Sequence, residues 1–490
     1  MPGPSVIPFA QVHETHTGVV LLLGDRAYKV KKPVDLGFCD FTSVAERDRV
    51  CRREVELNRR LAPEAYLGVA ELHLPDGHAT EPVIVMRRMP PETRLATLAR
   101  EGRADGAVLT EIARRIADFH AGCDRRPDID ADATVAAIRA NWASSIAELR
   151  ELIASWPDAP LGTDDVDAIE AAAIRYLDGR TALFDARIAA GAVVDGHGDL
   201  LADDIFLLPE GPQILDCLEF DDHLRHVDRI DDIAFLAMDL ERLGAPELGR
   251  LLLTEYRRLT GDDAPASLVH HYQAYRALVR AKVTCVRARQ GDPEAPAAAR
   301  ALAQLCRDHL AAGTVRLILV GGLPGTGKST LAHAIAADLD CTVISTDRVR
   351  KELAGLDPDT PAPAGYGDGL YAPEHIAATY AAVMERAEAL LTHGRSVILD
   401  GSWTSAAPRA QARDLAERTA AVLVGLQCVA PAEVADARMV GRRGPSDANA
   451  EIAAAMRANA DPWSDAVPVD TGGELADAHK HAVDVVLGAL

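Results

Sequence analysis

The chain has 490 residues, of which 48% are hydrophobic and 26% are charged, a globular composition that excludes wholesale disorder. Its length predicts about two to four compact domains. A formal net charge of −22 at pH 7 makes nucleic acid and anionic lipid surfaces poor partners, because both are themselves negatively charged.

The sequence also argues against a membrane or secreted protein. It lacks an apolar run of the roughly 18 residues that span a bilayer, and the N-terminus lacks a basic stretch followed by an apolar one. The eight cysteines form no Cys-x-x-Cys pair, which disfavours a disulfide framework and a zinc knuckle. We therefore expect a cytoplasmic protein with buried thiols and no membrane partner.

The first part of the chain predicts a small sheet followed by helices. Two apolar runs at residues 19–23 and 27–30 flank Gly24-Asp25, a dipeptide typical of hairpin turns. An amphipathic helix is expected at 47–61 and a further strand at 82–86. Beyond Pro90-Pro91 the sequence becomes alanine-rich, and Pro and Gly breaks separate the predicted helices. These helices are expected at residues 108–121, 134–155 and 164–190, so a sheet lobe precedes a helical lobe.

An aspartate-rich loop interrupts the helical lobe. Residues 195–204 read D-G-H-G-D-L-L-A-D-D, and predicted strands at 205–208 and 213–215 lead to Asp216. Because an antiparallel hairpin returns the chain to its start, we expect Asp216 beside Asp199 and Asp204. Three carboxylates in one pocket repel one another unless a cation is present, so the loop predicts a divalent-metal site. The alternative is an acidic loop in a protein that is acidic throughout.

The last part of the chain predicts a parallel α/β sheet. Helices resume from residue 231 to about 310, and the Ala-Ala-Gly at 311–313 suits a domain boundary. Strands are then expected at 315–320, 342–344, 396–399 and 421–428, with helices between them. We expect two domains, at residues 1–310 and 314–490.

The first strand of the second domain runs into a loop that fits the pattern G-x-x-x-x-G-K-[ST]. Backbone N–H groups of such a loop and the N-terminus of the next helix surround phosphate oxygens. The lysine reaches the outer phosphates and the serine hydroxyl ligates Mg²⁺. A chance glycine-rich turn is the alternative, but a strand precedes the loop and an amphipathic run follows it. The predicted nucleotide-binding residues are Gly322, Gly325, Thr326, Gly327, Lys328, Ser329 and Thr330.

Polar residues follow two other strands of this domain. Asp400 ends the strand at 396–399, at the sheet edge where ligands of open α/β sheets bind, and it is expected to hold magnesium through water. The alternative for Asp400 is a helix cap. Asp347 and Arg350 share one face of a helix that follows the strand at 342–344. A carboxylate there can accept a proton from a hydroxyl nucleophile, whereas the alternative makes Thr346 or Asp347 an N-cap and leaves Arg350 solvated.

A cluster of arginines precedes a flexible Gly-Pro-Ser-Asp segment at residues 444–447. Arg438, Arg442 and Arg443 are candidates for a closing lid that neutralises a transferring phosphoryl group. The alternative is a solvated basic face.

Residues 315–470 resemble the P-loop kinases that phosphorylate small-molecule or nucleic-acid hydroxyls, such as gluconate, chloramphenicol and polynucleotide kinases. The resemblance rests on the phosphate loop, on the S-T-D-x-x-R run ending at Arg350, on the V-I-L-D run ending at Asp400, and on the arginine cluster. It implies ATP-dependent phosphoryl transfer with Asp347 as the base, and it leaves the acceptor open.

Residues of about 15–305 resemble the aminoglycoside phosphotransferase family and its relatives with the protein-kinase-like fold. The family's loop reads H-G-D-x-x-x-x-N and is followed by a hairpin and a metal-binding aspartate. The resemblance implies that Asp199 is the catalytic base and Asp216 a magnesium ligand. It also implies that Lys29 binds the ATP phosphates and that Glu54 orients this lysine.

Further positions complete this resemblance, and two depart from it. Asp232 is expected to anchor the catalytic loop, and Lys31 lies on the strand face of Lys29, so the two lysines can exchange roles. Asp204 stands where the family has asparagine as the second metal ligand; it keeps an oxygen but adds a negative charge. The nucleotide-covering loop at 15–18 is short and lacks a glycine signature. His120 ends an apolar helical run and is expected to be a core histidine.

The whole sequence predicts an α+β protein-kinase-like bilobal domain followed by an α/β P-loop NTPase domain with a mostly parallel sheet. Each domain is expected to use ATP and Mg²⁺ to phosphorylate a hydroxyl of a small molecule. The alternative is an N-terminal pseudokinase that senses nucleotide and regulates a P-loop small-molecule or nucleic-acid end kinase. The acceptors and the oligomeric state are left open by the sequence.

Overall fold

The computed structural model describes residues 9–14, 17–35, 40–73, 80–357, 369, 372–439 and 450–489. The chain forms two compact units. The first comprises Met1–Asp165, Ala186–Ala264 and Tyr272–Cys306; the second comprises Val166–Asp185, Pro265–His271 and Arg307–Leu490. Because two segments of the helical region join the second unit, contacts do not divide the chain at a single point. The division into domains 1–310 and 314–490 stays a prediction.

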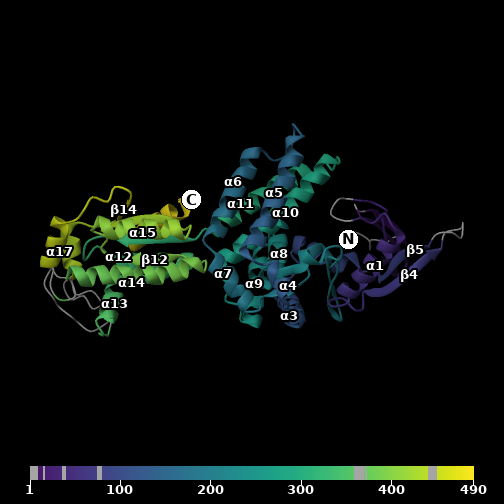
Figure 1. The fold of residues 1–490 in the computed structure, drawn as a ribbon, viewed down its shortest axis with the longest axis horizontal. Helices are drawn as coiled ribbons and strands as arrows, with labels where there is room; N and C mark the ends of the chain where they lie inside the picture. Colours follow the sequence, from purple (N-terminus) through teal and green to yellow (C-terminus); the bar gives the residue numbers. More distant parts are fainter. Residues whose placement is uncertain are drawn as a thin grey trace, which may run out of the picture. The chain divides into compact units, whose positions relative to one another are not determined.

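The first unit begins with a five-stranded antiparallel sheet in the order β1-β2-β3-β5-β4. Figure 1 labels β4 and β5 of this sheet, with α1 beside them. The hairpin between β2 and β3 turns at Gly24, whose φ of 59° suits a residue without a Cβ. Helix α1 packs on the sheet, where Cys51 and Val55 join a core with Tyr66 and Ile84. These elements are β1 (Ala10–Glu14), β2 (Gly18–Leu23), β3 (Arg26–Lys31), α1 (Val44–Asn58), β4 (Tyr66–His73) and β5 (Thr80–Arg87).

Helices follow this sheet, as expected. The segment 164–190 forms two helices, where the sequence predicts one, because the chain breaks at Gly179 and Arg180. A Cβ on Gly179 would lie 2.0 Å from the carbonyl oxygen of Thr419, and the Arg180 guanidinium donates to that oxygen. The helices are α2 (Leu95–Arg100), α3 (Gly106–Gly122), α4 (Pro127–Ala131), α5 (Val135–Ala154), α6 (Thr163–Asp178), α7 (Thr181–Ala189), α8 (Arg229–Arg242), α9 (Pro246–Thr260), α10 (Ala266–Arg289) and α11 (Ala295–Ala312), with short 3₁₀ turns at Pro91–Thr93, Ala202–Asp204 and Asp222–Arg225.

Two small antiparallel ribbons frame the aspartate-rich loop. β6 (Val193–Asp195) pairs with β9 (His226–Asp228), and β7 (Ile205–Leu208) pairs with β8 (Gly211–Ile214). The loop runs from the end of β6 to the start of β7, and Asp216 follows β8. The expected hairpin is therefore present and returns the chain to the loop.

The second unit contains a five-stranded parallel sheet in the order β11-β12-β10-β13-β14, which confirms the expected α/β class. Buried apolar residues of β10 and β13, among them Val320 and Leu426, pack with Leu331 and Ile335 of α12. The elements are β10 (Arg316–Gly321), α12 (Lys328–Leu339), β11 (Thr342–Ser345), α13 (Thr346–Leu353), α14 (Pro373–Thr392), β12 (Val397–Asp400), α15 (Ala406–Arg418), β13 (Val422–Val429), α16 (Ala432–Met439), α17 (Ala450–Ala458), β14 (Val467–Asp470) and α18 (Leu475–Gly488).

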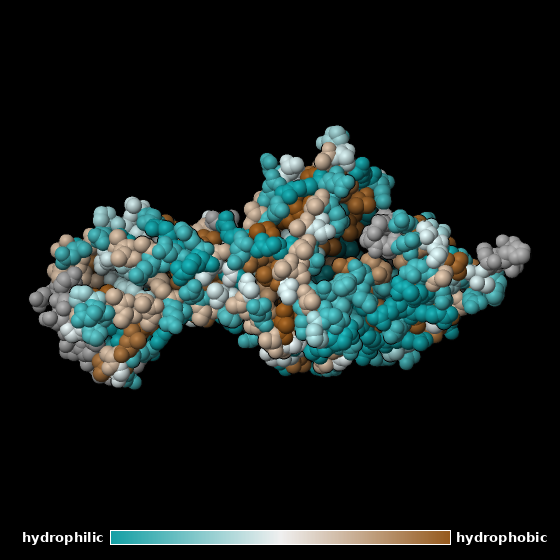
Figure 2. All heavy atoms as spheres, viewed as in Figure 1, coloured by the Kyte–Doolittle hydropathy of each residue, from teal (hydrophilic) through white to brown (hydrophobic). Residues whose placement is uncertain are grey.

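Hydrophilic side chains cover much of the visible face of each unit, in keeping with the charged composition (Figure 2). Within the described ranges, the structure has no helix that combines the length and the apolar character needed to cross a bilayer.

Candidate active sites

The candidate site of the first unit is built around Lys29 on β3. Its Nζ atom donates hydrogen bonds to Glu54 Oε1 and to Asp216 Oδ1, each at 2.8 Å. Glu54 comes from α1 and is fully buried, whereas Asp216 follows β8 and is about half exposed. Burial alone would lower the pKa of Lys29, but the charges of Asp216 and Glu54 outweigh it and raise the pKa well above its ordinary value. Lys29 thus joins two carboxylates that are distant in the sequence.

Lys31 occupies the same strand face, as its spacing from Lys29 predicts. Its Nζ atom lies 2.7 Å from Glu54 Oε2 and also pairs with Glu219, a residue that the sequence analysis missed. Burial favours the protonated form of Glu54, but the two lysines reverse this effect and lower its pKa. Lys29 is therefore the lysine beside Asp216, and Lys31 is the lysine beside Glu219.

Asp232 on α8 holds the aspartate-rich loop in place through hydrogen bonds to its backbone. Its carboxylate accepts hydrogen bonds from the backbone N–H of His197 at 2.7 Å and of Gly198 at 3.0 Å. His120 contacts the same carboxylate through Nε2 at 3.0 Å and the Tyr256 hydroxyl through Nδ1 at 2.7 Å. Asp232 is an anchor of the loop, as the resemblance implies, and His120 is the buried core histidine that the sequence predicts.

Other anchors of the loop were not found by sequence reasoning. Arg276 on α10 pairs with Asp231 and donates to the Gly198 carbonyl oxygen at 3.1 Å. Arg60 donates to the carbonyl oxygens of residues 195 and 196 at 2.9 and 2.8 Å. Asn58 accepts from the backbone N–H of Cys217 at 2.8 Å. No sequence motif distinguishes these residues, because an arginine or asparagine in a predicted helical region is ordinarily expected to be a solvated side chain.

Three carboxylates of this site act on one another electrostatically, which agrees with the expected convergence of the loop and the hairpin. Burial raises the pKa of Asp199 to about 6. Burial, with the charges of Asp216 and Asp199, raises the pKa of Asp204 well above its ordinary value. Lys29 lowers the pKa of Asp216 to about 2. Carboxylate oxygens are the donor type that Mg²⁺ prefers, so the chemistry of this set suits a magnesium ion.

The candidate site of the second unit begins with the loop between β10 and α12. Gly322, Gly325 and Gly327 have φ angles of 140°, 80° and 84°, a region that residues with a Cβ rarely adopt. A Cβ on Gly322 would lie 2.6 Å from the Cys428 carbonyl oxygen, and one on Gly325 would lie 2.3 Å from that of Ala435. Glycine is therefore favoured at all three positions by its backbone conformation, and at Gly322 and Gly325 on steric grounds as well.

The polar side chains of the loop take defined places. Thr326 is buried and donates to the Leu323 carbonyl oxygen at 2.8 Å, and Lys328 donates to the same oxygen at 3.0 Å. Ser329 donates to Asp400 Oδ2 at 2.7 Å, while Thr330 is exposed in the first turn of α12. The hydroxyl and the carboxylate thus lie together, a pair of oxygen donors that suits magnesium.

Asp400 is buried at the end of β12, and burial raises the pKa of its carboxyl. Helix α15 begins only at Ala406, with Ser405 at its N-cap position. The helix-cap alternative for Asp400 is therefore wrong.

Asp347 and Arg350 lie on α13, which follows β11 at the carboxyl edge of the sheet. Asp347 Oδ1 accepts a hydrogen bond from Arg350 Nη2, and Arg350 is mostly buried. Ser345 is the N-cap residue of α13, so the alternative that makes Thr346 or Asp347 the cap is wrong.

A cavity of about 550 Å³ joins the residues of this site. Its lining includes the predicted residues Lys328, Ser329, Asp347, Arg350 and Asp400. The sequence analysis missed further lining residues, among them Thr379 and Tyr380 of α14, Met456 of α17 and Asn459, which follows α17. The cavity is large enough for a small organic molecule beside the phosphate loop.

Arg438 lies near the loop as well. A Cβ on Gly327 would lie 3.6 Å from Arg438 Nη1, which places this guanidinium beside the loop although the residue is exposed. Arg442 and Arg443 lie outside the described residues, so the expected lid is not tested.

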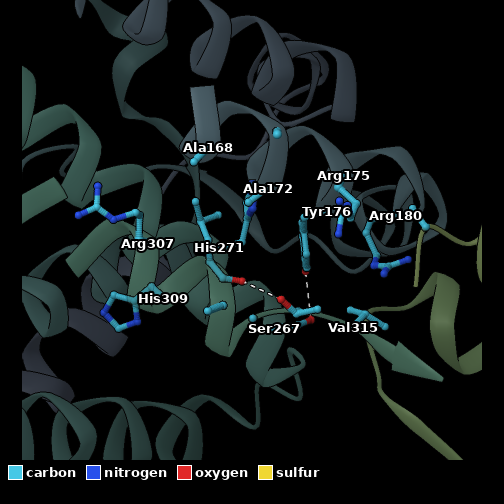
Figure 3. A pocket seen from close by; sticks show the side chains of 16 residues that line it. Ala168, Ala172, Arg175, Tyr176, Arg180, Ser267, His271, Arg307, His309 and Val315 are labelled. Carbon is cyan, nitrogen blue, oxygen red and sulfur yellow. Dashed lines mark hydrogen bonds between the residues drawn. The ribbon is translucent and has the colours of Figure 1, made fainter. Parts of the chain in front are cut away.

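A second cavity of this unit, of about 310 Å³, has no part in the predicted site (Figure 3). Tyr176 and His271 stack in its wall with ring centroids 4.4 Å apart. Val315, which precedes β10, also lines it, whereas the phosphate loop follows β10. None of the catalytic, nucleotide-binding or metal-binding residues that the sequence predicts is among its lining residues.

Comparison with known proteins gives one family model and one group of close relatives. The model of the AAA domain (AAA_33) matches residues 317–463. The uncharacterized protein Rv2004c of Mycobacterium tuberculosis (strain H37Rv) is 48% identical over 467 residues, which cover 95% of this chain and 93% of the relative.

Solved structures match the two regions separately. A choline/ethanolamine kinase family protein from Mesorhizobium loti covers 64% of this chain and 95% of its own, with 16% identity and a TM-score of 0.36. The GDP complex of an aminoglycoside 2′-phosphotransferase gives the same values. A sugar kinase from Janibacter covers 35% of this chain and 94% of its own, with 20% identity and a TM-score of 0.28.

Proposed function

We propose that this chain, which belongs to the same family as the protein Rv2004c of Mycobacterium tuberculosis, is a bifunctional phosphotransferase in the cytoplasm. Each unit transfers the γ-phosphoryl group of ATP to a hydroxyl of a small molecule. The observation that carries the proposal is the cavity of about 550 Å³ in the second unit, where the phosphate-loop lysine Lys328 and the pair Asp347 and Arg350 line one space. The first unit supports it with the cluster of Lys29, Glu54 and Asp216.

In the second unit, the phosphate loop binds the nucleotide and the cavity binds the acceptor. Asp347 accepts the proton of the acceptor hydroxyl as its oxygen attacks the γ-phosphorus, and the bond from that phosphorus to the bridging oxygen of ADP breaks. Arg350 holds the carboxylate in place through its hydrogen bond. Ser329 and Asp400 would hold Mg²⁺, which neutralises charge on the phosphates.

In the first unit, Lys29 binds the α- and β-phosphates and Glu54 orients it. Asp199 lies on a loop that Asp232 and Arg276 fix, and it acts as the base toward a second acceptor. Asp204 and Asp216 would hold the magnesium of this site.

One observation favours a different role for the first unit. Asp204 adds a third carboxylate to the site, and its pKa is raised well above the ordinary value by burial and by the charges of Asp216 and Asp199. A site that binds cation and nucleotide without turnover would make this unit a nucleotide sensor that regulates the second.

The experiment uses the full chain and ³²P transfer from γ-labelled ATP to a panel of sugars, amino sugars, nucleosides and aminoglycosides. Lys328→Ala should abolish transfer to the acceptors of the second unit alone, and Asp199→Asn should abolish transfer to those of the first. Lys480→Ala and Asp118→Asn replace exposed residues and are the matched controls.

The outcomes separate the two roles of the first unit. Transfer that depends on Asp199 supports two activities. Nucleotide binding at Lys29 without any transfer that depends on Asp199 supports the sensor, and transfer that survives Lys328→Ala and Asp199→Asn together contradicts both assignments.

A further inference from the structure

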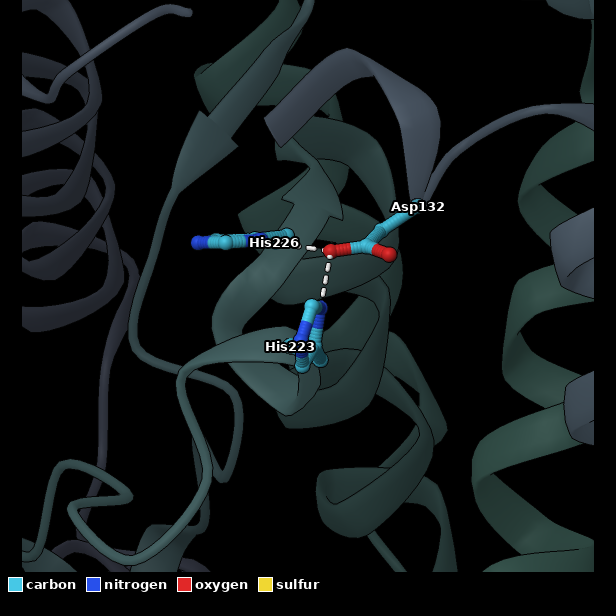
Figure 4. A group of neighbouring side chains, drawn as sticks. All are labelled: Asp132, His223 and His226. Carbon is cyan, nitrogen blue, oxygen red and sulfur yellow. Dashed lines mark hydrogen bonds and ion pairs between the residues drawn. The ribbon is translucent and has the colours of Figure 1, made fainter. Parts of the chain in front are cut away.

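Three metal-ligating side chains converge in the first unit, outside the site described above (Figure 4). Asp132 follows α4, His223 lies in the 3₁₀ turn Asp222–Arg225, and His226 begins β9. Their ligand atoms all lie within 4.8 Å of one another. The Nδ1 atoms of His223 and His226 lie 2.7 and 2.6 Å from the same oxygen, Asp132 Oδ2.

The segments that carry these side chains are fixed independently of the cluster. His226 is buried and pairs in register with Asp195 of β6. The Asp221 side chain accepts a hydrogen bond from the His223 backbone N–H, and Arg225 in the same turn is bonded to Asp195. The histidines and the carboxylate are therefore brought together by the backbone, which is how preorganised metal sites are built.

We propose that Asp132, His223 and His226 bind one divalent transition-metal ion of the zinc class. Two imidazole nitrogens and one carboxylate oxygen form a typical zinc ligand set with a remaining position for water. Ligand atoms about 2.1 Å from a tetrahedral ion lie about 3.4 Å from one another, so the observed contacts must widen by less than about 1 Å. The Asp132 side chain, which is 25% exposed and takes part in both contacts, and the exposed His223 side chain supply this freedom.

The site differs in chemistry and place from the proposed magnesium sites. Imidazole nitrogen selects zinc, copper or nickel over magnesium, which prefers oxygen. The bound ion joins the end of α4 to the segment between Asp216 and β9. β9 pairs with β6, and the loop that carries Asp199 begins at the end of β6. The ion would therefore stabilise the β6–β9 ribbon from which that loop starts.

The test uses the untagged full chain, freed of metal with a chelator and kept in millimolar Mg²⁺ to fill the oxygen sites. Co²⁺ titration is followed by visible absorption, and Zn²⁺ is then added to displace the cobalt. We expect one absorbing Co²⁺ per chain, and zinc affinity that falls at least about tenfold in His223→Gln and in Asp132→Asn. His393→Gln replaces an exposed histidine of the second unit and should leave the affinity unchanged.

Variants of the buried His226 and of the exposed His223 are both made, so that the test does not depend on the folding of the first. His226→Gln is expected to lose binding too, but if this variant does not fold, His223→Gln still gives the answer, since its side chain is 75% exposed. A wild-type chain without the cobalt absorption overturns the proposal. Equal affinity in wild type, His223→Gln and Asp132→Asn overturns it as well, and the cluster is then only a hydrogen-bonded joint.

Discussion

Asp347 lines the same cavity of the second unit as Lys328. If it is the base of the transfer step, Asp347→Asn should lower kcat by roughly 10²- to 10⁴-fold with ATP affinity nearly unchanged. Its stability should change by about 1 kcal/mol at most, because Asp347 is not the N-cap residue of α13 and Asn keeps an oxygen that can accept from Arg350. Steady-state kinetics and thermal unfolding measure the two effects, with Asp414→Asn on exposed α15 surface as the control. A normal kcat in Asp347→Asn would mean that the base lies elsewhere.

Asp204 is the carboxylate whose charge the first unit accommodates least well. Burial and the charges of Asp216 and Asp199 raise its pKa well above the ordinary value, so its ionised form opposes folding when no cation is bound. Asp204→Asn should therefore raise the melting temperature in chelator by about 2–4 °C, the equivalent of about 1 kcal/mol.

The same variant should bind magnesium more weakly while any transfer by the first unit persists or rises. The rise in melting temperature that Mg²⁺ produces should accordingly be smaller in Asp204→Asn than in wild type. Asp118→Asn changes an exposed carboxylate of the first unit outside the site and is the control. A variant that folds normally but loses transfer would show that the carboxylate is needed and that asparagine does not replace it.

At the scale of residues, the sequence predicts those that belong to a motif and misses those that support it. Lys29, Glu54 and Asp232 are found because the resemblance assigns a position to each. Arg276 and Arg60 reach the aspartate-rich loop from 78 and 136 residues away, and nothing local distinguishes them from surface arginines. Only packing shows that their guanidinium groups satisfy buried carbonyl oxygens.

At the scale of elements, α6 and α10 meet through a stacked pair of rings, Tyr176 and His271. Burial lowers the pKa of His271 from 6.5 to about 3. As the pH falls, His271 of an unfolded chain takes up a proton near pH 6.5, whereas His271 of the folded chain takes it up only near about pH 3. The unfolded state therefore binds more protons between these values. The stability linked to His271 is fully present above about pH 6.5 and is lost as the pH falls toward about 3.

His271→Phe keeps an aromatic ring at this position without a titrating group. From about pH 6.5 to about pH 4.5, the wild type should lose up to about 3 kcal/mol of stability that His271→Phe does not lose. Urea unfolding at several pH values measures the difference, and His393→Phe at an exposed position should follow the wild type. If the wild-type and His271→Phe curves run parallel, the folded histidine takes up its proton near its ordinary pKa.

Helices and strands with a clear hydrophobic pattern in the sequence were predictable, whereas features that depend on tertiary contacts were not. Strands β10 and β12 are buried runs, β13 alternates between buried and partly exposed residues, and each of the three lies within about one residue of its expected range. β1 is almost wholly exposed and β4 is exposed over its second half, so neither shows an apolar alternation. The break between α6 and α7 depends on the close approach of Gly179 to Thr419, which no local pattern encodes.

At the scale of the whole molecule, a chain of net charge −22 binds an anionic nucleotide only where cations are concentrated. Such positions occur in both units: Lys29 and Lys31 in the first, and Lys328, Arg350 and Arg438 in the second. All residues of each candidate site belong to one unit. Neither site needs residues of the other, so each should bind nucleotide by itself.

Titration calorimetry of the full chain with a non-hydrolysable ATP analogue and Mg²⁺ tests this independence. Because each unit has its own phosphate-binding lysine, the wild type should bind about two nucleotides per chain. Lys328→Ala should leave about one, and Lys29→Met should also leave about one, since each variant removes the cation of a single site. Lys480→Ala is exposed on α18 and should still bind about two. The affinity of the remaining site should match its wild-type value within about twofold, because the two sites share no residue. A wild type that binds one nucleotide, lost in Lys328→Ala and kept in Lys29→Met, would leave the first unit without a nucleotide site.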